Sequence, residues 1–217
     1  MNFFITGTDT GVGKTYVTAL LLRSLRSQKI DVVGMKPIET GGNHDAQELH
    51  AAMAGCIPMQ NVNPVCLSHG LAPAVAAEME GRSIPLEEIF ARYRKLSLEH
   101  SLVLVEGAGG WRVPIAADYE MADLALDLSK ISPLQVIVVA LNRLGIINHV
   151  LLTVESVRAR GLECAGFILN QGDCPIPDPS TPLNAHWIVP HVPLWFEVKT
   201  GQTILSQSAL GRVVSCS

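Results

Sequence analysis

The feature that most constrains the fold is the glycine-rich segment GTDTGVGKT at residues 7–15. It follows an apolar run at residues 3–5 and directly precedes a stretch in which apolar residues recur at helical spacing. In such a strand-to-helix turn, glycines let backbone N–H groups turn inward around phosphates, and the helix N-terminus adds partial positive charge. Lys14 supplies a cation, and the Thr15 hydroxyl suits Mg²⁺. The segment predicts a bound nucleoside triphosphate with a magnesium ion beside it.

The spacing of this loop differs from the usual one by one residue. Gly7 lies six positions before Gly13, and Thr8 occupies the position of the standard first glycine. An ordinary glycine-rich turn is the alternative, but Gly-Lys-Thr stands between a strand and a helix, where the phosphate-binding motif requires it. The residues expected to contact the nucleotide here are Gly11, Val12, Gly13, Lys14, Thr15 and Tyr16.

Short apolar runs alternate with helix-period segments along the chain, and this alternation predicts the fold class. The runs lie at residues 3–5, 32–35, 102–105, 136–140 and 165–169. Strand-helix-strand repeats predict an α/β fold, a mostly parallel sheet with helices on both faces and the ligand site at the carboxyl ends of the strands. The length of 217 residues favours one domain spanning residues 1–217.

Two C-terminal segments give weaker signals. Residues 172–182 hold four prolines, which cannot sustain a helix, so this segment is expected to be a loop. Residues 200–217 show only a weak helical pattern.

Two acids and a second lysine stand near predicted strand ends. Glu106 follows the run at residues 102–105, where a second magnesium contact would lie, and glycines follow it; a strand-end acid that caps the next helix is the alternative. Asp45 precedes a helical segment at residues 46–54, and its spacing alone favours an N-cap. Lys36 directly follows the run at residues 32–35. From its position alone, a role in the site and a merely solvent-exposed side chain are equally open.

Composition narrows the classes of partner. A formal net charge of -4 without a Lys/Arg run argues against nucleic acid. The N-terminus has no basic region ahead of its apolar residues, and no apolar run approaches the roughly 20 residues of a membrane span, so we expect a cytosolic protein without a membrane anchor. Only 17% of residues are charged, which favours surface buried against another subunit, although a sheet covered on both faces gives the same composition.

The cysteines predict free thiols. They are odd in number, scattered and without a C-x-x-C pair: Cys56, Cys66, Cys164, Cys174 and Cys216. Cys164 begins an apolar run and is expected to be buried.

Four sequence blocks, taken in order, resemble the dethiobiotin synthetase family. They are GTDTxVGKT at residues 7–15, KPIxTG at 36–41, VEGAGGW at 105–111 and LGxINH at 144–149. The resemblance covers residues 3–170 and resumes faintly at 192–195. It implies a homodimeric enzyme that converts 7,8-diaminononanoate, CO₂ (or bicarbonate) and MgATP into dethiobiotin, ADP and phosphate.

The resemblance also implies residue roles. Lys14 and Lys36 fall on the family's catalytic lysines, and Thr15, Asp45 and Glu106 fall on its Mg²⁺ ligands. The implied contacts to the diamine substrate are Thr10 and Thr40, and those to its carboxylate are Gly145, Ile146, Ile147 and Asn148 at a helix start, which suits an anion. The further implied nucleotide contacts are Asp45, Glu106, Gly107, Ala108, Gly109, Asn170, Gln171, Pro193, Leu194 and Trp195.

Three departures from the family pattern concern the rim of the site. Gly11 stands where some members carry an acid, and Gln171 stands where an acid is also found. The prolines at residues 175–182 replace part of a helix that, in the family, helps form the substrate end of the site across the dimer. None of these positions belongs to the phosphate chemistry.

Two rival classes share such a loop. A regulatory ATPase switch, which dimerises around ATP and binds a protein or membrane partner, usually carries a lysine four residues before the second glycine, where this chain has Asp9. An amidotransferase or ligase acting on a cofactor precursor would need a further domain with a nucleophilic cysteine, and none is visible in 217 residues. The synthetase is therefore the favoured prediction.

Overall fold

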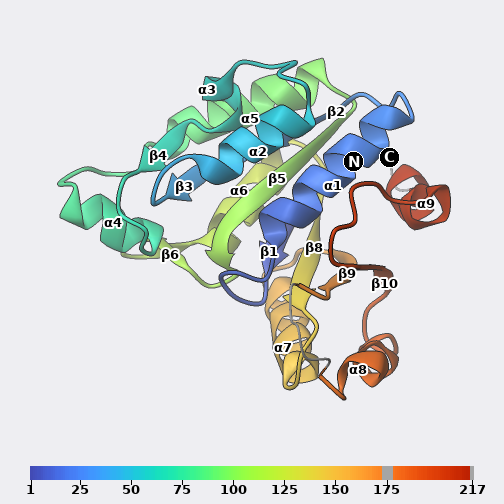
Figure 1. The fold of residues 1–217 in the computed structure, drawn as a ribbon. Coiled ribbons are helices and arrows are strands. Elements are labelled where there is room, and N and C mark those ends of the chain that lie inside the picture. The colour runs from blue at the N-terminus through green and yellow to red at the C-terminus, as the bar shows by residue number, and fades with distance from the viewer. Residues whose placement is uncertain (173–177, 216–217) are drawn as a thin grey trace.

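A computed structural model describes residues 1–172 and 178–215, and within them a parallel sheet of six strands forms the centre of the molecule (Figure 1). The strand order is β10-β9-β8-β1-β5-β2. The strands are β1 (Asn2–Gly7), β2 (Val32–Met35), β5 (Leu102–Gly110), β8 (Leu134–Leu141), β9 (Cys164–Asn170) and β10 (Leu194–Val198). All five strands expected from the apolar runs are present, which confirms the α/β fold class.

Helices cover both faces of this sheet. In Figure 1, α1 lies in front of the sheet, while α5 and α6 lie behind it. The helices are α1 (Lys14–Ser27), α2 (His44–Ala52), α3 (Met59–Val62), α4 (Pro73–Met79), α5 (Leu86–Glu99), α6 (Met121–Ile131), α7 (Ile146–Ala159), α8 (Thr181–Ile188) and α9 (Gln207–Ser215). Two short ribbons lie beside the sheet: β3 (Ile38–Thr40) with β4 (Val65–Leu67), and β6 (Pro114–Ala116) with β7 (Tyr119–Glu120).

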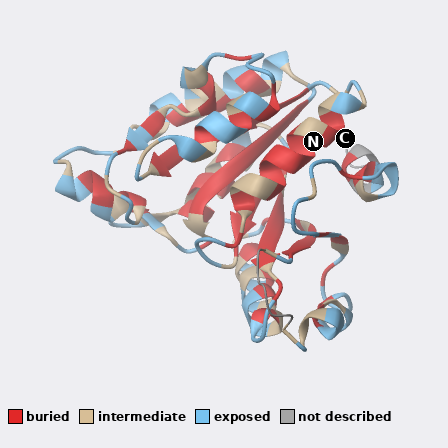
Figure 2. Cartoon of the chain, viewed as in Figure 1, coloured by how far each residue is buried: buried red, intermediate tan, exposed pale blue. Residues whose placement is uncertain are grey.

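The core follows from the double coverage of the sheet. Every residue of β1 and β2 is buried, as the red central strands in Figure 2 show, because a parallel sheet between helices has no solvated face. Phe3 meets the edge of Trp195 with ring centroids 5.1 Å apart. A Cβ atom at Gly166 would lie 2.2 Å from the Trp195 ring, so glycine there makes room for the indole.

The central strands deliver the chemical groups to one edge of the sheet. The glycine-rich loop leaves β1, and Ile5 of β1 lies beside Glu106 of β5 in the parallel register. Glu106 is inside β5 rather than at its end, because β5 continues to Gly110 and pairs there with Gly7. The predicted strand end at residue 105 is therefore wrong.

One prediction about the C-terminal region also needs correction, and the weak helical pattern of the tail has a physical explanation. The proline-rich loop was expected to reach residue 182, but α8 begins at Thr181 and contains Pro182, since the first turn of a helix needs no N–H from that residue. Residues 173–177 of this segment lie outside the described residues. In the tail, α9 buries Leu210 and Val213, and the Leu205 N–H donates to Ser24 Oγ of α1 at 2.8 Å, so tertiary contacts stabilise a weak helical pattern.

The cysteines agree with the predicted free thiols where they are described. Cys164 is buried, whereas Cys56 and Cys66 are exposed. Burial raises the pKa of the Cys164 thiol to about 11, so little thiolate forms at pH 8. We expect iodoacetamide to alkylate Cys56 rapidly at pH 8 and Cys164 only in denaturant, as read by peptide mass mapping. Equal labelling of the two in the native protein would contradict the burial of Cys164.

Candidate active site

The glycine-rich loop wraps the start of α1. Gly13 occupies the N-cap position with φ 89°, a left-handed conformation that favours glycine, and Lys14 opens the helix. The Lys14 side chain is buried, and its Nζ donates to the Asp9 carbonyl at 3.3 Å. Burial, and then the nearby positive charge of Lys36, lower the Lys14 pKa to about 8. The loop thus presents a poorly solvated ammonium group to an incoming anion.

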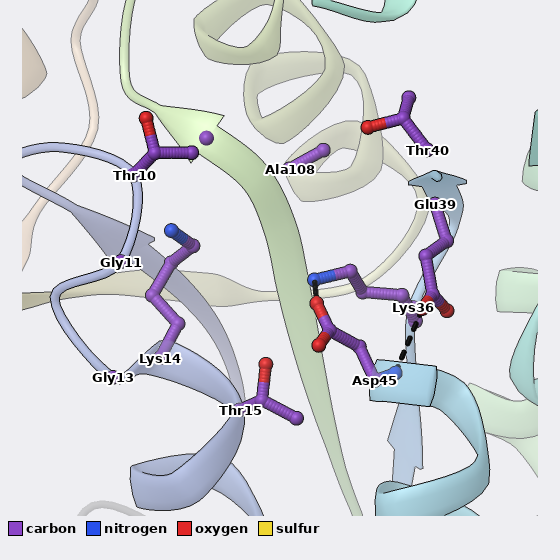
Figure 3. A pocket seen from close by; sticks show the side chains of 11 residues that line it. Thr10, Gly11, Gly13, Lys14, Thr15, Lys36, Glu39, Thr40, Asp45 and Ala108 are labelled. Carbon is purple, nitrogen blue, oxygen red and sulfur yellow. Dashed lines mark hydrogen bonds and ion pairs between the residues drawn. The ribbon is translucent and has the colours of Figure 1, made fainter. Parts of the chain in front are cut away.

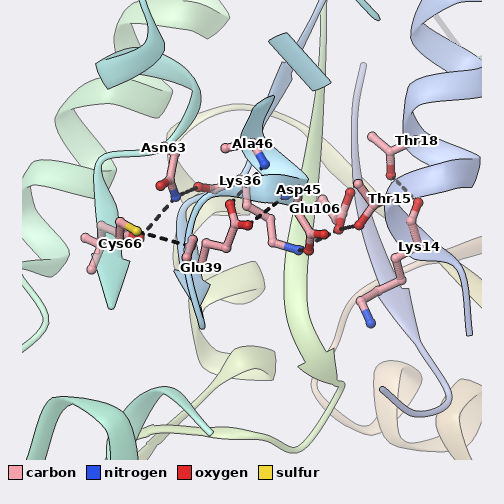
Figure 4. Close-up of polar contacts among 12 residues, drawn as sticks. Lys14, Thr15, Thr18, Lys36, Glu39, Asp45, Ala46, Asn63, Cys66 and Glu106 are labelled. Carbon is pink, nitrogen blue, oxygen red and sulfur yellow. Dashed lines mark hydrogen bonds and ion pairs between the residues drawn. The ribbon is translucent and has the colours of Figure 1, made fainter. Parts of the chain in front are cut away.

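Lys36, Asp45, Glu106 and Thr15 form one connected network (Figure 4). The Lys36 Nζ donates to Asp45 Oδ2 and to Glu106 Oε1, both at 2.6 Å. The Thr15 hydroxyl donates to the same Glu106 oxygen at 2.8 Å. The four groups come from α1, the segment after β2, the first turn of α2 and β5. The sequence-predicted lysine and the predicted metal ligands therefore meet at one point.

The network is strongly charged and little solvated. Glu106 is fully buried and Lys36 is 3% exposed, whereas Asp45 is half-exposed. Burial acts to lower the pKa of Lys36, but the two carboxylates outweigh it and the net shift is upward. Burial acts to raise the pKa of Asp45, and Lys36 outweighs it in the opposite direction. The Lys36 ammonium and the Asp45 carboxylate are therefore charged near neutral pH.

The oxygen atoms of this network suit Mg²⁺. In the part of the chain that is described, Glu106 Oε2 is buried and has no hydrogen-bond partner. A bound cation would satisfy this oxygen. Thr15 and Asp45 bring a hydroxyl and a second carboxylate beside it. The described part of the chain contains no cluster of three or more His, Cys, Asp or Glu side chains that could hold a metal ion without other ligands. Mg²⁺ bound through one or two carboxylates together with substrate phosphates needs no such cluster.

A cavity of about 280 Å³ opens over this network (Figure 3). It is lined by Thr10, Gly11, Gly13, Lys14, Thr15, Lys36, Glu39, Thr40, Asp45, Ala108 and Gly109. All but Glu39 were expected to be site residues. Glu39 occupies the variable position of the KPIxTG block, where the sequence offered no signal for a role.

The comparisons with known proteins agree with this geometry. A family model described as an AAA domain matches residues 1–205. The ATP-dependent dethiobiotin synthetase BioD of Anaeromyxobacter sp. (strain Fw109-5) is 47% identical over 185 residues, covering 83% of this chain and 81% of the relative. The same enzyme of Akkermansia muciniphila is 43% identical over 169 residues, covering 78% of each chain. The chain belongs to the ATP-dependent dethiobiotin synthetases. It is therefore a ligase of biotin biosynthesis that forms C–N bonds with ATP as co-substrate.

Solved structures show that the synthetase fold is shared more widely. The cell-division protein FtsY of Thermotoga maritima superposes with a TM-score of 0.58 at 16% identity, covering 99% of this chain and 68% of that one. MinD of Pyrococcus horikoshii, solved with Mg-ADP, gives 0.58 at 17% identity, covering 98% and 86%. At such identities these likenesses establish the P-loop fold alone.

A second cavity of the synthetase, of about 370 Å³, adjoins the other side of the glycine-rich loop. It is lined by Gly11, Gly13, Tyr16, Leu141, Asn170, Gly172, Thr200 and Gly201. Asn170 donates from its side-chain amide to the Val12 carbonyl at 3.0 Å, which ties the end of β9 to the loop. Tyr16 donates its hydroxyl to the Gln202 carbonyl. Thr200 and Gly201 were missed, because nothing in their local sequence indicates that β10 returns to this edge.

Pro193, Leu194 and Trp195, which the resemblance implies as base contacts, are not among the residues that line this second cavity in the described chain. Leu194 pairs with Phe167 at the amino end of β10, whereas Val198, beside Asn170, marks the carboxyl end. Trp195 is buried in the core and donates its indole N–H to the Ala165 carbonyl at 2.9 Å. Among the described residues these three therefore do not line the cavity near Asn170. Gln171 is exposed, and its N–H donates to the Val198 carbonyl at 3.0 Å.

Gly107 and residues 145–148 were also predicted to contact ligands, but they do not line the cavity over the network in the described chain. A Cβ atom at Gly107 would lie 3.0 Å from the Phe4 ring, so its lack of a side chain serves packing. Residues 145–148 form the N-terminus of α7, with Gly145 at the N-cap, and in the described chain they do not line the cavity over the network. A third cavity, of about 440 Å³, instead places later residues of α7 opposite Thr10 and Trp111.

Proposed function

We propose that the synthetase closes the ureido ring of dethiobiotin from 7,8-diaminononanoate, CO₂ and MgATP. The observation that carries this proposal is that Lys14, Lys36, Thr15 and Asp45 line one cavity at the carboxyl edge of the sheet. The buried Glu106 accepts hydrogen bonds there from Lys36 and Thr15. Two cations beside a metal site match the demands of phosphoryl transfer, which needs positioning and charge neutralisation.

CO₂ is captured as a carbamate on one amine of the substrate, and the carbamate oxygen attacks the γ-phosphate of ATP. ADP leaves, and the neighbouring amine attacks the resulting carbamic-phosphoric anhydride, so that the ring closes and phosphate departs. Lys14 and Lys36 stabilise the charge that develops on the transferring phosphoryl group. Thr15, Asp45 and Glu106 would hold Mg²⁺, which neutralises phosphate charge when bound.

ATP is proposed to span the two cavities, and the diamine to share the cavity over the network with the phosphates. The triphosphate follows the loop N–H groups to Lys14, and we place the adenine in the cavity beside Asn170 and Tyr16, with Thr200 and Gly201 behind it. Ala108 and Gly109 border the phosphate cavity, and Thr10 and Thr40 line the part of it suited to the diamine.

We further propose a homodimer in which residues 145–148 receive the substrate carboxylate of the partner protomer's site. A helix N-terminus suits an anion, and among the described residues those at the start of α7 do not line the cavity over the network of their own chain. Sedimentation should give about twice the chain mass of 23.3 kDa.

An activity complementation test addresses the shared site. Lys36→Ala and Asn148→Asp homodimers should each be nearly inactive, the second because its added carboxylate repels that of the substrate. An equal mixture, exchanged by mild denaturation, should regain about a quarter of wild-type activity. The regained activity would come from mixed dimers with one intact site. A mixture no more active than either parent would contradict a site shared between protomers.

The synthetase is proposed to act as one cytoplasmic domain. The exposed free thiols Cys56 and Cys66 suit a reducing compartment. Across the described residues, helices are too short or too polar to cross a bilayer.

The deciding experiment measures phosphate release from MgATP with and without 7,8-diaminononanoate and bicarbonate, followed by mass analysis of the organic product. Release that needs both and yields dethiobiotin supports the proposal. Release indifferent to the diamine would instead indicate a switch-like ATPase and overturn it.

A further inference from the structure

Glu39 is a buried carboxylate beside the proposed metal site that the proposed mechanism does not use. It lies in the middle of β3 and is 5% exposed. Its Oε1 accepts the Asp45 backbone N–H at 2.7 Å, and its Oε2 accepts the Ala46 backbone N–H at 2.9 Å (Figures 3 and 4). Both oxygens of one side chain are thus engaged with two successive backbone donors of α2.

These two donors would otherwise be unsatisfied, because the first N–H groups of a helix have no partner within it. Asn43 occupies the N-cap position of α2, yet within the described residues it makes no side-chain capping bond. Its Oδ1 instead accepts the Gln47 side-chain amide at 2.9 Å. Glu39 therefore caps α2 from the preceding strand β3. The negative charge of its carboxylate also suits the positive end of the helix dipole.

The position of α2 sets the position of Asp45. Asp45 is the second residue of α2, and its carboxylate accepts from Lys36 at 2.6 Å. The chain reaches α2 through Gly41 and Gly42, both with positive φ (80° and 118°), a turn whose glycines give it little stiffness of its own. The hydrogen bond from the Asp45 backbone N–H to Glu39 therefore helps to hold the Asp45 carboxylate near Glu106 and Thr15.

We infer that Glu39 is a positioning residue, which fixes the N-terminus of α2 and so holds Asp45 at the metal site. The inference rests on the proposed function, in which Asp45 binds Mg²⁺. Glu39 acts through the backbone, in the way that outer partners of metal ligands orient them.

The test uses Glu39→Gln in the full-length enzyme, with Asn43→Ala and Asp45→Asn as references. Glutamine keeps the size of the side chain but replaces one acceptor oxygen with an NH₂ group that cannot accept the second N–H. In the presence of ADP, we expect Mn²⁺ binding followed by electron paramagnetic resonance to weaken about tenfold in Glu39→Gln. Asn43→Ala should bind Mn²⁺ like wild type, and Asp45→Asn should lose more affinity than Glu39→Gln.

Two further readouts separate positioning from a general loss of stability. Hydrogen exchange at the Asp45 and Ala46 amides should accelerate in Glu39→Gln, while exchange in β1 and β5 stays as in wild type. In steady-state assays, the Mg²⁺ concentration for half-maximal rate should rise about tenfold, with a smaller change in kcat at saturating Mg²⁺.

Unchanged exchange at the two amides, or unchanged Mn²⁺ affinity in Glu39→Gln while Asp45→Asn loses it, would overturn the role of Glu39 alone. If Asp45→Asn binds Mn²⁺ as wild type does, Asp45 is not a ligand and the inference falls with that assignment. Failure of the proposed reaction is seen separately, as wild-type phosphate release that does not need the diamine.

Discussion

Lys36→Ala is expected to lower kcat by at least about thirtyfold, which corresponds to ~2 kcal/mol of lost transition-state stabilisation. The physical reason is that Lys36 is a buried ammonium group on the wall of the phosphate cavity, where few water dipoles can replace its charge. The measurement is steady-state phosphate release at saturating diamine, bicarbonate and MgATP. Lys95→Ala, which removes an exposed lysine from α5, serves as the control and should leave kcat unchanged.

The same substitution should expose the electrostatic role of Lys36 in the free protein. Without the ammonium group, the fully buried Glu106 faces Asp45 with no cation between them. The free energy of unfolding in EDTA should fall by roughly 3 kcal/mol, the low end for a broken buried pair because Asp45 is half-exposed. Mg²⁺ should restore part of that loss. Near-normal turnover, or stability indifferent to Mg²⁺, would refute the assignment of Lys36 to this site.

Gly13→Ala is expected to give the second large effect, on both stability and nucleotide binding. Gly13 has φ 89°, and a Cβ atom there would lie 2.2 Å from Asn170 Nδ2. The left-handed backbone costs about 1 kcal/mol for alanine, and the overpacking against buried Asn170 adds about 1–3 kcal/mol. The free energy of unfolding, measured with urea, should fall by this sum. Calorimetry should show weaker MgATP binding, since relieving the clash displaces the loop.

Gly11→Ala is the matched control within the same loop. Gly11 also has a positive φ, 71°, but among the described residues a Cβ atom there would meet nothing within 4 Å. It should therefore lose only the backbone term of about 1 kcal/mol. The open space agrees with the resemblance, in which some family members carry an acid at this position. Equal losses of stability in the two variants would show that the contact with Asn170 is not what requires glycine at residue 13.

Much of the site was predictable because its groups lie next to strong local signals. Lys14 and Thr15 belong to a motif whose strand and helix are both visible in the sequence, and Lys36 and Glu106 follow or continue apolar runs. Parallel strands bring their carboxyl ends to one edge, so the meeting of these groups follows from topology alone. The resemblance added the metal role of Asp45, which spacing had read as an N-cap; the N-cap residue of α2 is Asn43.

Other features depended on contacts between distant segments. The sequence does not show where β10 begins, so it did not indicate that Thr200 and Gly201 line the cavity beside Asn170. The base contacts at residues 193–195 stay a prediction. Glu39 lies in β3 but caps the N-terminus of α2. No local capping pattern in the sequence indicates this contact. The roles of residues 145–148 and the dimer stay predictions.

The sequence by itself determined the alternation of strands and helices, the phosphate-binding loop and the identity of its cation and hydroxyl, because each depends on neighbours within a few positions. The tertiary structure alone decided that Glu106 lies inside a strand, that Lys36 pairs with two carboxylates and that Glu39 accepts the Asp45 backbone N–H. The physical reason is that charge pairing, burial and remote capping are set by packing between elements, which local periodicity does not contain.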